Sequence, residues 1–447
     1  VVEAQFAASM VKYQYNHYNE AANGFRNLIN KYPDHVNAPD AARLLLSALM
    51  LSRNISALNE AAEEIKANPK LMQDDVPRIV QEIIERKDYN LCFEYEQQGR
   101  FTKSAECFLD YIRKFPNTKL KDGSLYHAAD KFFKARLVER SLEANGQLVN
   151  EMPTSPLAAR ALYNIADTYR RLAVYSEAAR IYEVFVGLHP KHELTEEALR
   201  FATTFRSGLG EHDKAITDLR KYLQLFPKSE HVASVAFNIA TTYEKQGKYD
   251  QAIKEFERWL TRYGKGGGLD LYLQTHLQIA RTQEKTRGGA RKAREWYNKT
   301  VAAYAGLTDE EKGKVTSVGL SAAAEAQFME GEAQMAEMRA VELKLPEKVL
   351  IAGIAQKGEL VTKALETFTV VEGFGQPNWT IAATTRKGQG LQELAVAIEE
   401  SPTPRGLNPD ARAIYRQGMA DRATPLFERA KEAYRQCVEV ARELKWY

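Results

Sequence analysis

The chain has 447 residues, of which 62 are basic and 59 acidic, giving a formal net charge of +3 at pH 7. This balance argues against binding to nucleic acid or to an anionic membrane, because both select strongly basic surfaces. No apolar run approaches the roughly 20 residues that a membrane-spanning helix needs, so no transmembrane segment is expected.

The first 88 residues are expected to form helices, with a regular pattern near the start. An aromatic residue is followed by a small residue three positions later, a large apolar residue at seven and a proline at fifteen. These residues are Tyr18, Ala21, Phe25 and Pro33. Residues 38–69 look like a less regular helical pair, and residues 76–99 look like one long helix.

The same marks recur between residues 89 and 305. Four prolines in this stretch, Pro116, Pro153, Pro190 and Pro227, are spaced 37 residues apart. A fixed period of this size is typical of a repeat solenoid. The successive sets are Phe101, Ser104, Phe108 and Pro116; Val138, Ser141, Asn145 and Pro153, the weakest copy; Tyr175, Ala178, Tyr182 and Pro190; His212, Ala215, Leu219 and Pro227; and Tyr249, Ala252, Phe256 and Gly264.

Each unit is expected to be a pair of helices. In the first half of one unit, Leu162, Ile165, Ala166 and Tyr169 fall on a single face of a 3.6-residue helix. A small residue such as Gly247 then permits a tight turn. In the second half, the small residue lets the two helices approach closely and the large one fills the space between them. Proline ends the unit because it cannot continue a helix.

This pattern resembles the tetratricopeptide repeat (TPR). The hallmark positions are occupied by Ile165, Ala166, Tyr169, Tyr175, Ala178, Tyr182 and Pro190. The resemblance implies a right-handed α-solenoid that binds proteins or peptides. The linkers "FPNTKLKDGSLYHAA" and "FPKSEHVASVAF" are similar to those of envelope TPR proteins of Gram-negative bacteria, a group that includes the Tol-associated periplasmic coordinator and outer-membrane assembly lipoproteins.

The C-terminal region, residues 306–447, does not show the repeat and is expected to be an array of longer helices that caps the solenoid. One long helix is predicted to start at a capping box formed by Thr308 and Glu311. Further helices are expected on either side of a turn at "FGQPNW" and after a loop at "PTPRGLNP". The last helix should be interrupted or kinked by Pro425.

The three cysteines, Cys92, Cys107 and Cys437, do not form a disulfide framework by their number or spacing. Cys92 and Cys107 occupy apolar positions on the two helices of one repeat. A buried cysteine behaves as a small hydrophobic residue. Free buried thiols are therefore expected, with a disulfide between Cys92 and Cys107 as the alternative.

No pattern of catalytic residues is present, so no enzyme activity, cofactor or metal site is predicted. The glycine-rich stretch at residues 264–268 lacks the spacing of a phosphate-binding loop and is interpreted as a flexible turn. His189 and His192 lie in a loop without a third ligand nearby, which indicates solvated histidines rather than a metal site.

Asparagine recurs at one position of the first helix in three repeats, as Asn90, Asn164 and Asn238. By analogy with TPR proteins this position faces the concave groove, where a side-chain amide can both donate to and accept from a partner's backbone. The alternative is that these amides bond within the solenoid. In the repeat between those of Asn164 and Asn238, the equivalent position is occupied by Phe201. A clamp for a partner's C-terminal carboxylate is therefore not expected.

A basic cluster lies between residues 280 and 294. It is interpreted either as a patch for an acidic partner or lipid headgroups, or as a solvated turn between two helices. Its members are Arg281, Lys285, Arg287, Arg291, Lys292 and Arg294.

The sequence thus predicts a non-enzymatic scaffold for protein partners in a bacterial cell-envelope complex, such as gliding-motility or outer-membrane machinery. A periplasmic or envelope-associated location is expected. The chain starts at Val1 rather than Met, and a signal peptide or lipid anchor before it, or the partners themselves, would provide membrane association. The alternative is a cytoplasmic regulatory protein that senses a peptide.

Overall fold

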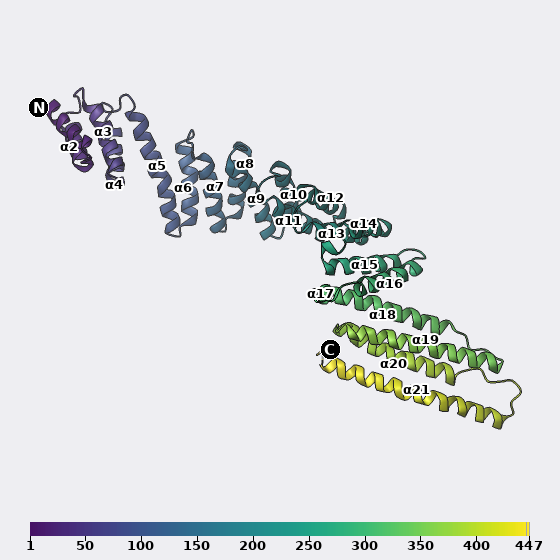
Figure 1. Ribbon diagram of the computed structural model, residues 1–447. Coiled ribbons are helices and arrows are strands. Elements are labelled where there is room, and N and C mark those ends of the chain that lie inside the picture. Colours follow the sequence, from purple (N-terminus) through teal and green to yellow (C-terminus); the bar gives the residue numbers. More distant parts are fainter. Residues whose placement is uncertain (444, 447) are drawn as a thin grey trace. The chain divides into compact units, whose positions relative to one another are not determined.

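The computed structural model describes residues 1–443, 445 and 446, and all regular structure in this part of the chain is helical. Figure 1 shows the helices following one another as antiparallel pairs, and consecutive helices pack together within each unit. The predicted all-α solenoid is confirmed. The chain forms two compact units, Val1–Ala198 and Leu199–Tyr447, and the division falls inside α11 (Thr195–Gly208).

The first unit contains the N-terminal helices and the first regular repeats. Its long helix, residues 76–97, confirms the continuous helix predicted there. The helices are α1 (Val2–Gln14), α2 (Tyr18–Lys31), α3 (Ala38–Leu51), α4 (Ile55–Lys66), α5 (Val76–Gln97), α6 (Phe101–Lys114), α7 (Lys121–Lys134), α8 (Val138–Glu151), α9 (Pro156–Arg171) and α10 (Tyr175–Leu188).

The second unit begins with two further repeat pairs and ends in long helices. Figure 1 shows α18–α21 lying side by side. The elements are α12 (His212–Leu225), α13 (Val232–Lys245), α14 (Tyr249–Arg262), the 3₁₀ turn η1 (Gly264–Gly267), α15 (Leu269–Glu284), α16 (Ala290–Ala305), α17 (Asp309–Lys312), α18 (Ser317–Ala340), α19 (Glu347–Gly373), α20 (Pro377–Glu399) and α21 (Pro409–Glu443).

The repeat positions have the packing roles that their spacing predicts. The small residues Ser104, Ala178 and Ala252 are fully buried, and so are the large residues that follow them one helical turn later, such as Phe108 and Phe256. Gly247 adopts a φ of 72° in the turn between α13 and α14, a conformation that glycine reaches without steric cost. These pairs thus close around a buried aromatic side chain.

One expectation about the C-terminal region is wrong. The long helix predicted from Thr308 is two helices, because the chain leaves the helical path between α17 and α18. The Thr308–Glu311 capping box is present but caps only the short α17. Asp270 of α15 accepts hydrogen bonds from Thr316 and Gly319 and thereby fixes a new N-terminus for α18.

The long last helix is present as predicted, as α21 from Pro409 to Glu443. Pro425 lies inside it and does not interrupt it. The turn at "FGQPNW" and the loop at "PTPRGLNP" are present as predicted. The glycine-rich stretch after α14 is the single turn η1, where Gly267 lies beneath the Trp259 ring with no room for a Cβ atom.

Candidate partner-binding surfaces

The three predicted asparagines lie on α5, α9 and α13. Asn90 and Asn238 are exposed and Asn164 is half-buried. Thr168 and Thr242 donate hydrogen bonds to the backbone carbonyls of Asn164 and Asn238, at 2.7 and 2.6 Å. Among the described residues, none of the three side-chain amides has a hydrogen-bond partner. The alternative role, bonding within the solenoid, therefore has no support in these contacts.

On α7, the position equivalent to Asn90 and Asn164 is occupied by His127. Its ring stacks on Phe108 at 5.3 Å between centroids and meets the edge of Phe93 at 5.0 Å. Burial lowers the pKa of His127, which favours the neutral imidazole. The asparagine series is thus interrupted within the first unit by an aromatic contact.

A small pocket of about 160 Å³ lies between α7, α8 and α9. Asn164, Asp167 and Arg171 contribute its wall from α9, and Asp130 lies opposite on α7. The guanidinium of Arg171 is 5.3 Å from the centre of the Phe133 ring. The pocket therefore combines aromatic surface with groups that can donate and accept hydrogen bonds.

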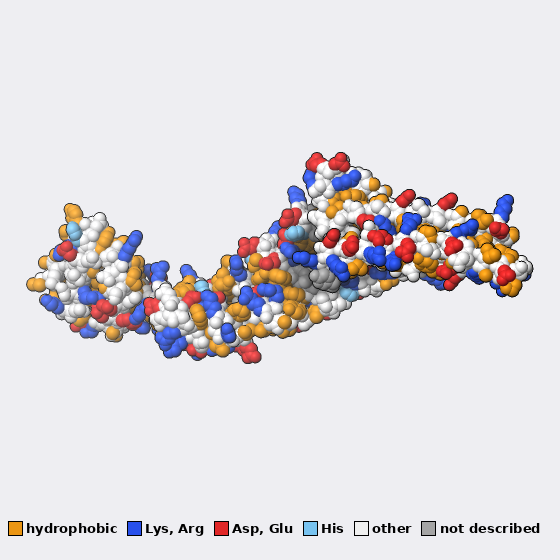
Figure 2. Space-filling model, turned by 90° about the horizontal axis from the view of Figure 1, so that it is seen from below, with side chains coloured by type: hydrophobic (Ala, Val, Ile, Leu, Met, Phe, Trp, Pro, Cys, Tyr) orange, Lys and Arg blue, Asp and Glu red, His pale blue; other side chains and the backbone are white. Residues whose placement is uncertain are grey.

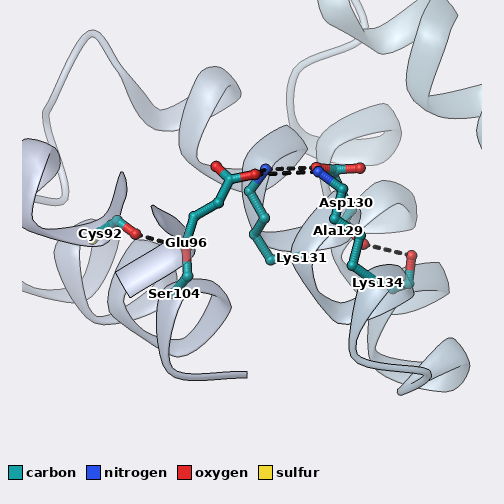
Figure 3. Close-up of polar contacts among 8 residues, drawn as sticks. Cys92, Glu96, Ser104, Ala129, Asp130, Lys131 and Lys134 are labelled. Atoms are coloured by element: carbon teal, nitrogen blue, oxygen red, sulfur yellow. Dashed lines mark hydrogen bonds and ion pairs between the residues drawn. The ribbon is translucent and has the colours of Figure 1, made fainter. Parts of the chain in front are cut away.

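Next to this pocket, α5 and α7 are joined by a charged network (Figure 3). The Lys131 ammonium is almost completely buried and contacts both Glu96 of α5 and Asp130, while Lys134 contacts the same two carboxylates at 3.2 and 3.1 Å. Burial by itself would raise the pKa of Glu96 and Asp130. The hydrogen bonds from the two lysines outweigh that effect and leave both pKa values lowered.

The second unit has a groove of its own, of about 360 Å³, between α13, α15 and α18. Phe237, the neighbour of Asn238, forms part of it together with Lys245 and the exposed Val318. Arg281 and Glu325 form an ion pair in its wall, with Nε and Oε1 2.6 Å apart. This groove offers apolar surface beside charges that are already paired.

The predicted basic cluster is largely neutralised within the second unit. Arg281 pairs with Glu325, Lys285 with Glu244, Arg291 with Glu295, and Arg294 with both Glu330 and Glu337. The hydrogen bonds that Arg281 and Arg294 donate to these carboxylates raise the pKa of both guanidinium groups. On the face shown in Figure 2, acidic and basic side chains are interspersed. Among the described residues, only Arg287 and Lys292 of this cluster lack an ion-pair partner.

The cysteine expectation is wrong for two of the three residues. Cys92 of α5 and Cys107 of α6 form a disulfide, with their Cα atoms 5.4 Å apart. The small Ser104 lets α6 approach α5 closely, and its hydroxyl donates to the Cys92 carbonyl at 2.7 Å (Figure 3). Cys437 is a free, partly buried thiol that lies 3.1 Å from the Thr385 hydroxyl.

Neither an ion site nor a membrane span emerges from the described residues. In that part of the chain, no group of three or more His, Cys, Asp or Glu side chains is arranged to hold a metal ion. His189 and His192 pack against the Phe185 ring instead. No described helix combines the length and apolar character needed to cross a bilayer.

The sequence interpretation missed the polar residues that surround the asparagines. Asp130 and Lys131 lie near the end of α7, and no sequence pattern distinguishes them from other charged residues. Asn145 stands at the large apolar position of the weakest repeat copy, and this departure from the pattern is the visible signal. In the structure, Asn145 lines the pocket between α7, α8 and α9.

Comparison with solved structures finds several helical-repeat proteins at low identity. A structure of MamA protein is 16% identical, covering 44% of this chain and 98% of its own, with a TM-score of 0.31. MamA from Desulfovibrio magneticus RS-1 is 12% identical over 41% of this chain and 94% of its own, with a TM-score of 0.28. A tetratricopeptide repeat protein from Parabacteroides merdae is 14% identical over 65% of this chain and 96% of its own, with a TM-score of 0.29.

No curated protein matches the chain significantly. Two sequence profiles of the tetratricopeptide repeat do match it, one over residues 160–192 and 198–229 and the other over residues 231–306. These segments coincide with the helix pairs from α9 to α16. The chain therefore carries tetratricopeptide repeats, a type of repeat that indicates a scaffold for protein–protein interaction.

Proposed function

We propose that this chain is a non-enzymatic scaffold that holds protein partners within an envelope complex of a Gram-negative bacterium. The observation that carries the binding role is the set of unpartnered amides of Asn90, Asn164 and Asn238, at one repeat position on the first helix of their pairs. An amide of this kind can grip a partner's backbone at two points. The linkers resemble those of envelope TPR proteins, which supports a place in a cell-envelope complex such as outer-membrane or motility machinery.

The disulfide between Cys92 and Cys107 supports an extracytoplasmic location. Disulfides persist in oxidising compartments such as the periplasm, whereas cytosolic thiols are kept reduced. A cytoplasmic peptide sensor, the competing function, would work with both thiols free. Fractionation of cells that express the complete gene, with thiol alkylation before lysis, separates the two. Recovery with a cytosolic marker and alkylation of both cysteines would favour the sensor.

The binding role is tested by changing Asn90, Asn164 and Asn238 together to alanine. We expect partners recovered from a native extract to be lost or reduced, while helix content measured by circular dichroism is unchanged. The matched control replaces three exposed glutamines, Gln81, Gln147 and Gln251, by alanine. If both triple variants recover the same partners as the unmodified chain, the asparagine surface is not the binding site.

A further inference from the structure

Asn145 is a polar residue at a position that the repeat reserves for a large apolar side chain. The corresponding residues of other repeats, Phe108, Tyr182, Leu219 and Phe256, are at most 3% exposed. Asn145 is equally buried, at 3%, but its side-chain oxygen has no hydrogen-bond partner among the described residues. A buried acceptor without a partner is unfavourable for folding. Residues that break a local rule in this way are often found at functional sites.

Asn145 lines the pocket of about 160 Å³ between α7, α8 and α9. Tyr126 and Phe133 of α7 provide its aromatic surface, and Asn164 of α9 adds a second amide without a hydrogen-bond partner in the described part of the chain. Two polar but uncharged groups on different helices are thus available to a ligand in the same pocket.

The charged groups in the pocket are already occupied. Asp130 is bonded to Lys131 at 2.6 Å and to Lys134 at 3.1 Å. Asp167 binds Arg170 and Arg171 at 2.6 and 2.7 Å. A cationic ligand would have to compete with these four basic side chains. The groups that remain favour a neutral ligand that both donates and accepts hydrogen bonds.

We propose that this pocket receives the carboxamide side chain of an asparagine or glutamine from a bound protein partner. A carboxamide can both donate to and accept from side-chain amides, and the amides of Asn145 on α8 and Asn164 on α9 line the same pocket. Rotating the Asn145 amide by 180° exchanges its donor and acceptor, and a carboxamide complements either arrangement. This inference rests on the proposed scaffold function and specifies what one of its pockets recognises.

The key variant is Asn145→Leu, which restores the residue type that Leu219 provides in its own repeat. Leucine is larger than asparagine, so it narrows the pocket, and it removes the unpaired oxygen; the variant should therefore melt at the same temperature as the unmodified chain or higher. The matched control is Gln147→Leu, two residues along α8, where the side chain is exposed. A clear fall in the melting temperature of Asn145→Leu would show that Asn145 is satisfied by the fold and would overturn the inference.

The first measurement uses a random dodecapeptide library displayed on phage and selected against the full chain. We expect the selected peptides to share an asparagine or glutamine, and replacing it by leucine to weaken binding at least tenfold. Asn145→Leu should weaken binding of the original peptides by the same factor. Combining this change in the protein with the leucine change in the peptide should cause no further loss of affinity. Gln147→Leu should bind as the unmodified chain does. Equal affinity of the peptides for Asn145→Leu would overturn the pocket and leave the scaffold function standing.

The second measurement uses acetamide alone, with acetate and methylammonium as probes of similar size and opposite charge. In the NMR spectrum of protein labelled with ¹⁵N-asparagine, the side-chain amide signal of Asn145 is identified as the one absent from the spectrum of Asn145→Leu. Acetamide should shift this signal saturably and the charged probes should not. No saturable shift would mean that the pocket holds only water, which overturns the inference. A shift with acetamide but no selected peptides would keep the amide pocket and refute the scaffold function.

Discussion

Ala252 shows how one residue sets the distance between the helices of a repeat. Its side chain is fully buried in a cluster with Phe256 of its own helix and with Phe237 and Tyr243 of α13. Atoms added at Cβ would enter space that these rings already fill, because protein interiors are packed as densely as organic crystals. The identity of this small residue is therefore as important to the pair as the aromatic residues around it.

We expect Ala252→Leu to lower the free energy of unfolding by about 1–3 kcal/mol, because the added methylene and methyl groups overpack the contact between α13 and α14. Urea unfolding followed by circular dichroism measures the change. Gln251→Leu places the same side chain on the exposed face of α14 and should have little effect. An unchanged midpoint for Ala252→Leu would show that residue 252 is not at the helix contact.

At the residue scale, the sequence predicts positions better than pairings. The repeat spacing correctly placed Cys92 and Cys107 in apolar positions on the two helices of one repeat. Whether two sulfur atoms meet depends on the rotation of each helix and on a separation of a few ångströms, which periodicity does not determine. Asn145 illustrates the same limit. Its departure from the repeat pattern is visible in the sequence, but the pocket that it lines is formed by three helices, whose arrangement the pattern does not determine.

At the scale of elements, the disulfide binds α5 to α6 and closes a loop of 15 residues. Constraining a loop of that length in the unfolded chain is expected to stabilise the folded state by about 3 kcal/mol. The bridge also lies beside the aromatic cluster of Phe93 on α5, Phe108 on α6 and His127 on α7, so two of these three rings are on the helices that it joins. Removing the bridge should therefore loosen the first regular repeat in particular.

We expect replacement of Cys92 and Cys107 by alanine to lower the free energy of unfolding by about 3 kcal/mol, because the unfolded chain regains its freedom. A reductant should produce a similar loss in the unmodified chain and no further loss in the double variant. Cys437→Ala serves as the control for removing a thiol that forms no bridge. Titration of three free thiols in the oxidised, unfolded protein would contradict the disulfide.

The charged network between α5 and α7 predicts a dependence of stability on pH. Glu96 and Asp130 have folded-state pKa values below their ordinary values of 4.5 and 3.8. A lowered carboxyl pKa stabilises the folded state above the ordinary value, and this contribution is lost as the pH falls through the lowered value. The first unit should thus lose stability at pH values below about 4.

Lys131→Met tests this network by removing the buried ammonium while keeping most of the side chain's volume. We expect a loss of about 1–3 kcal/mol at pH 7, because the carboxylates lose their charged hydrogen-bond donor. At pH 3 and below, the difference from the unmodified chain should shrink as the carboxylates become protonated. Lys103→Met, at an exposed position of α6, is the control. A difference that stays constant from pH 7 to pH 2 would assign the effect to packing alone.

The sequence predicts helices well where the pattern repeats. It predicts them less well where a residue distant in the sequence fixes the start of a helix. The helix pairs between α6 and α14 follow from apolar spacing, a turn residue and a terminal proline or glycine. The break before α18 was missed because Asp270, on a helix earlier in the chain, fixes the new helix start. Local preference alone predicts that Pro425 interrupts or kinks α21; the helix is continuous through it and packs along α20.

At the scale of the whole molecule, helix pairs within each compact unit pack on their neighbours along the chain, so a local change should have a local effect. Hydrogen exchange measured by mass spectrometry can test this with the variants above. The cysteine double variant should exchange faster in α5–α7, and Ala252→Leu should do so in α13–α15. A chain with both changes should show the two effects together and no change elsewhere. Faster exchange across the entire chain in either variant would show that it unfolds as a single cooperative unit.

The order of the cysteines has a consequence for how the protein is made. Cys92 and Cys107 are consecutive cysteines, and Cys437 follows only near the other end of the sequence. In a chain that is exported with its N-terminus first, the two bridge partners reach the oxidant before the third thiol has emerged. Joining each new thiol to the previous one then yields the native bridge at once. In that setting, formation of the Cys92–Cys107 bridge would need an oxidant but no enzyme that rearranges wrong pairings among these three cysteines.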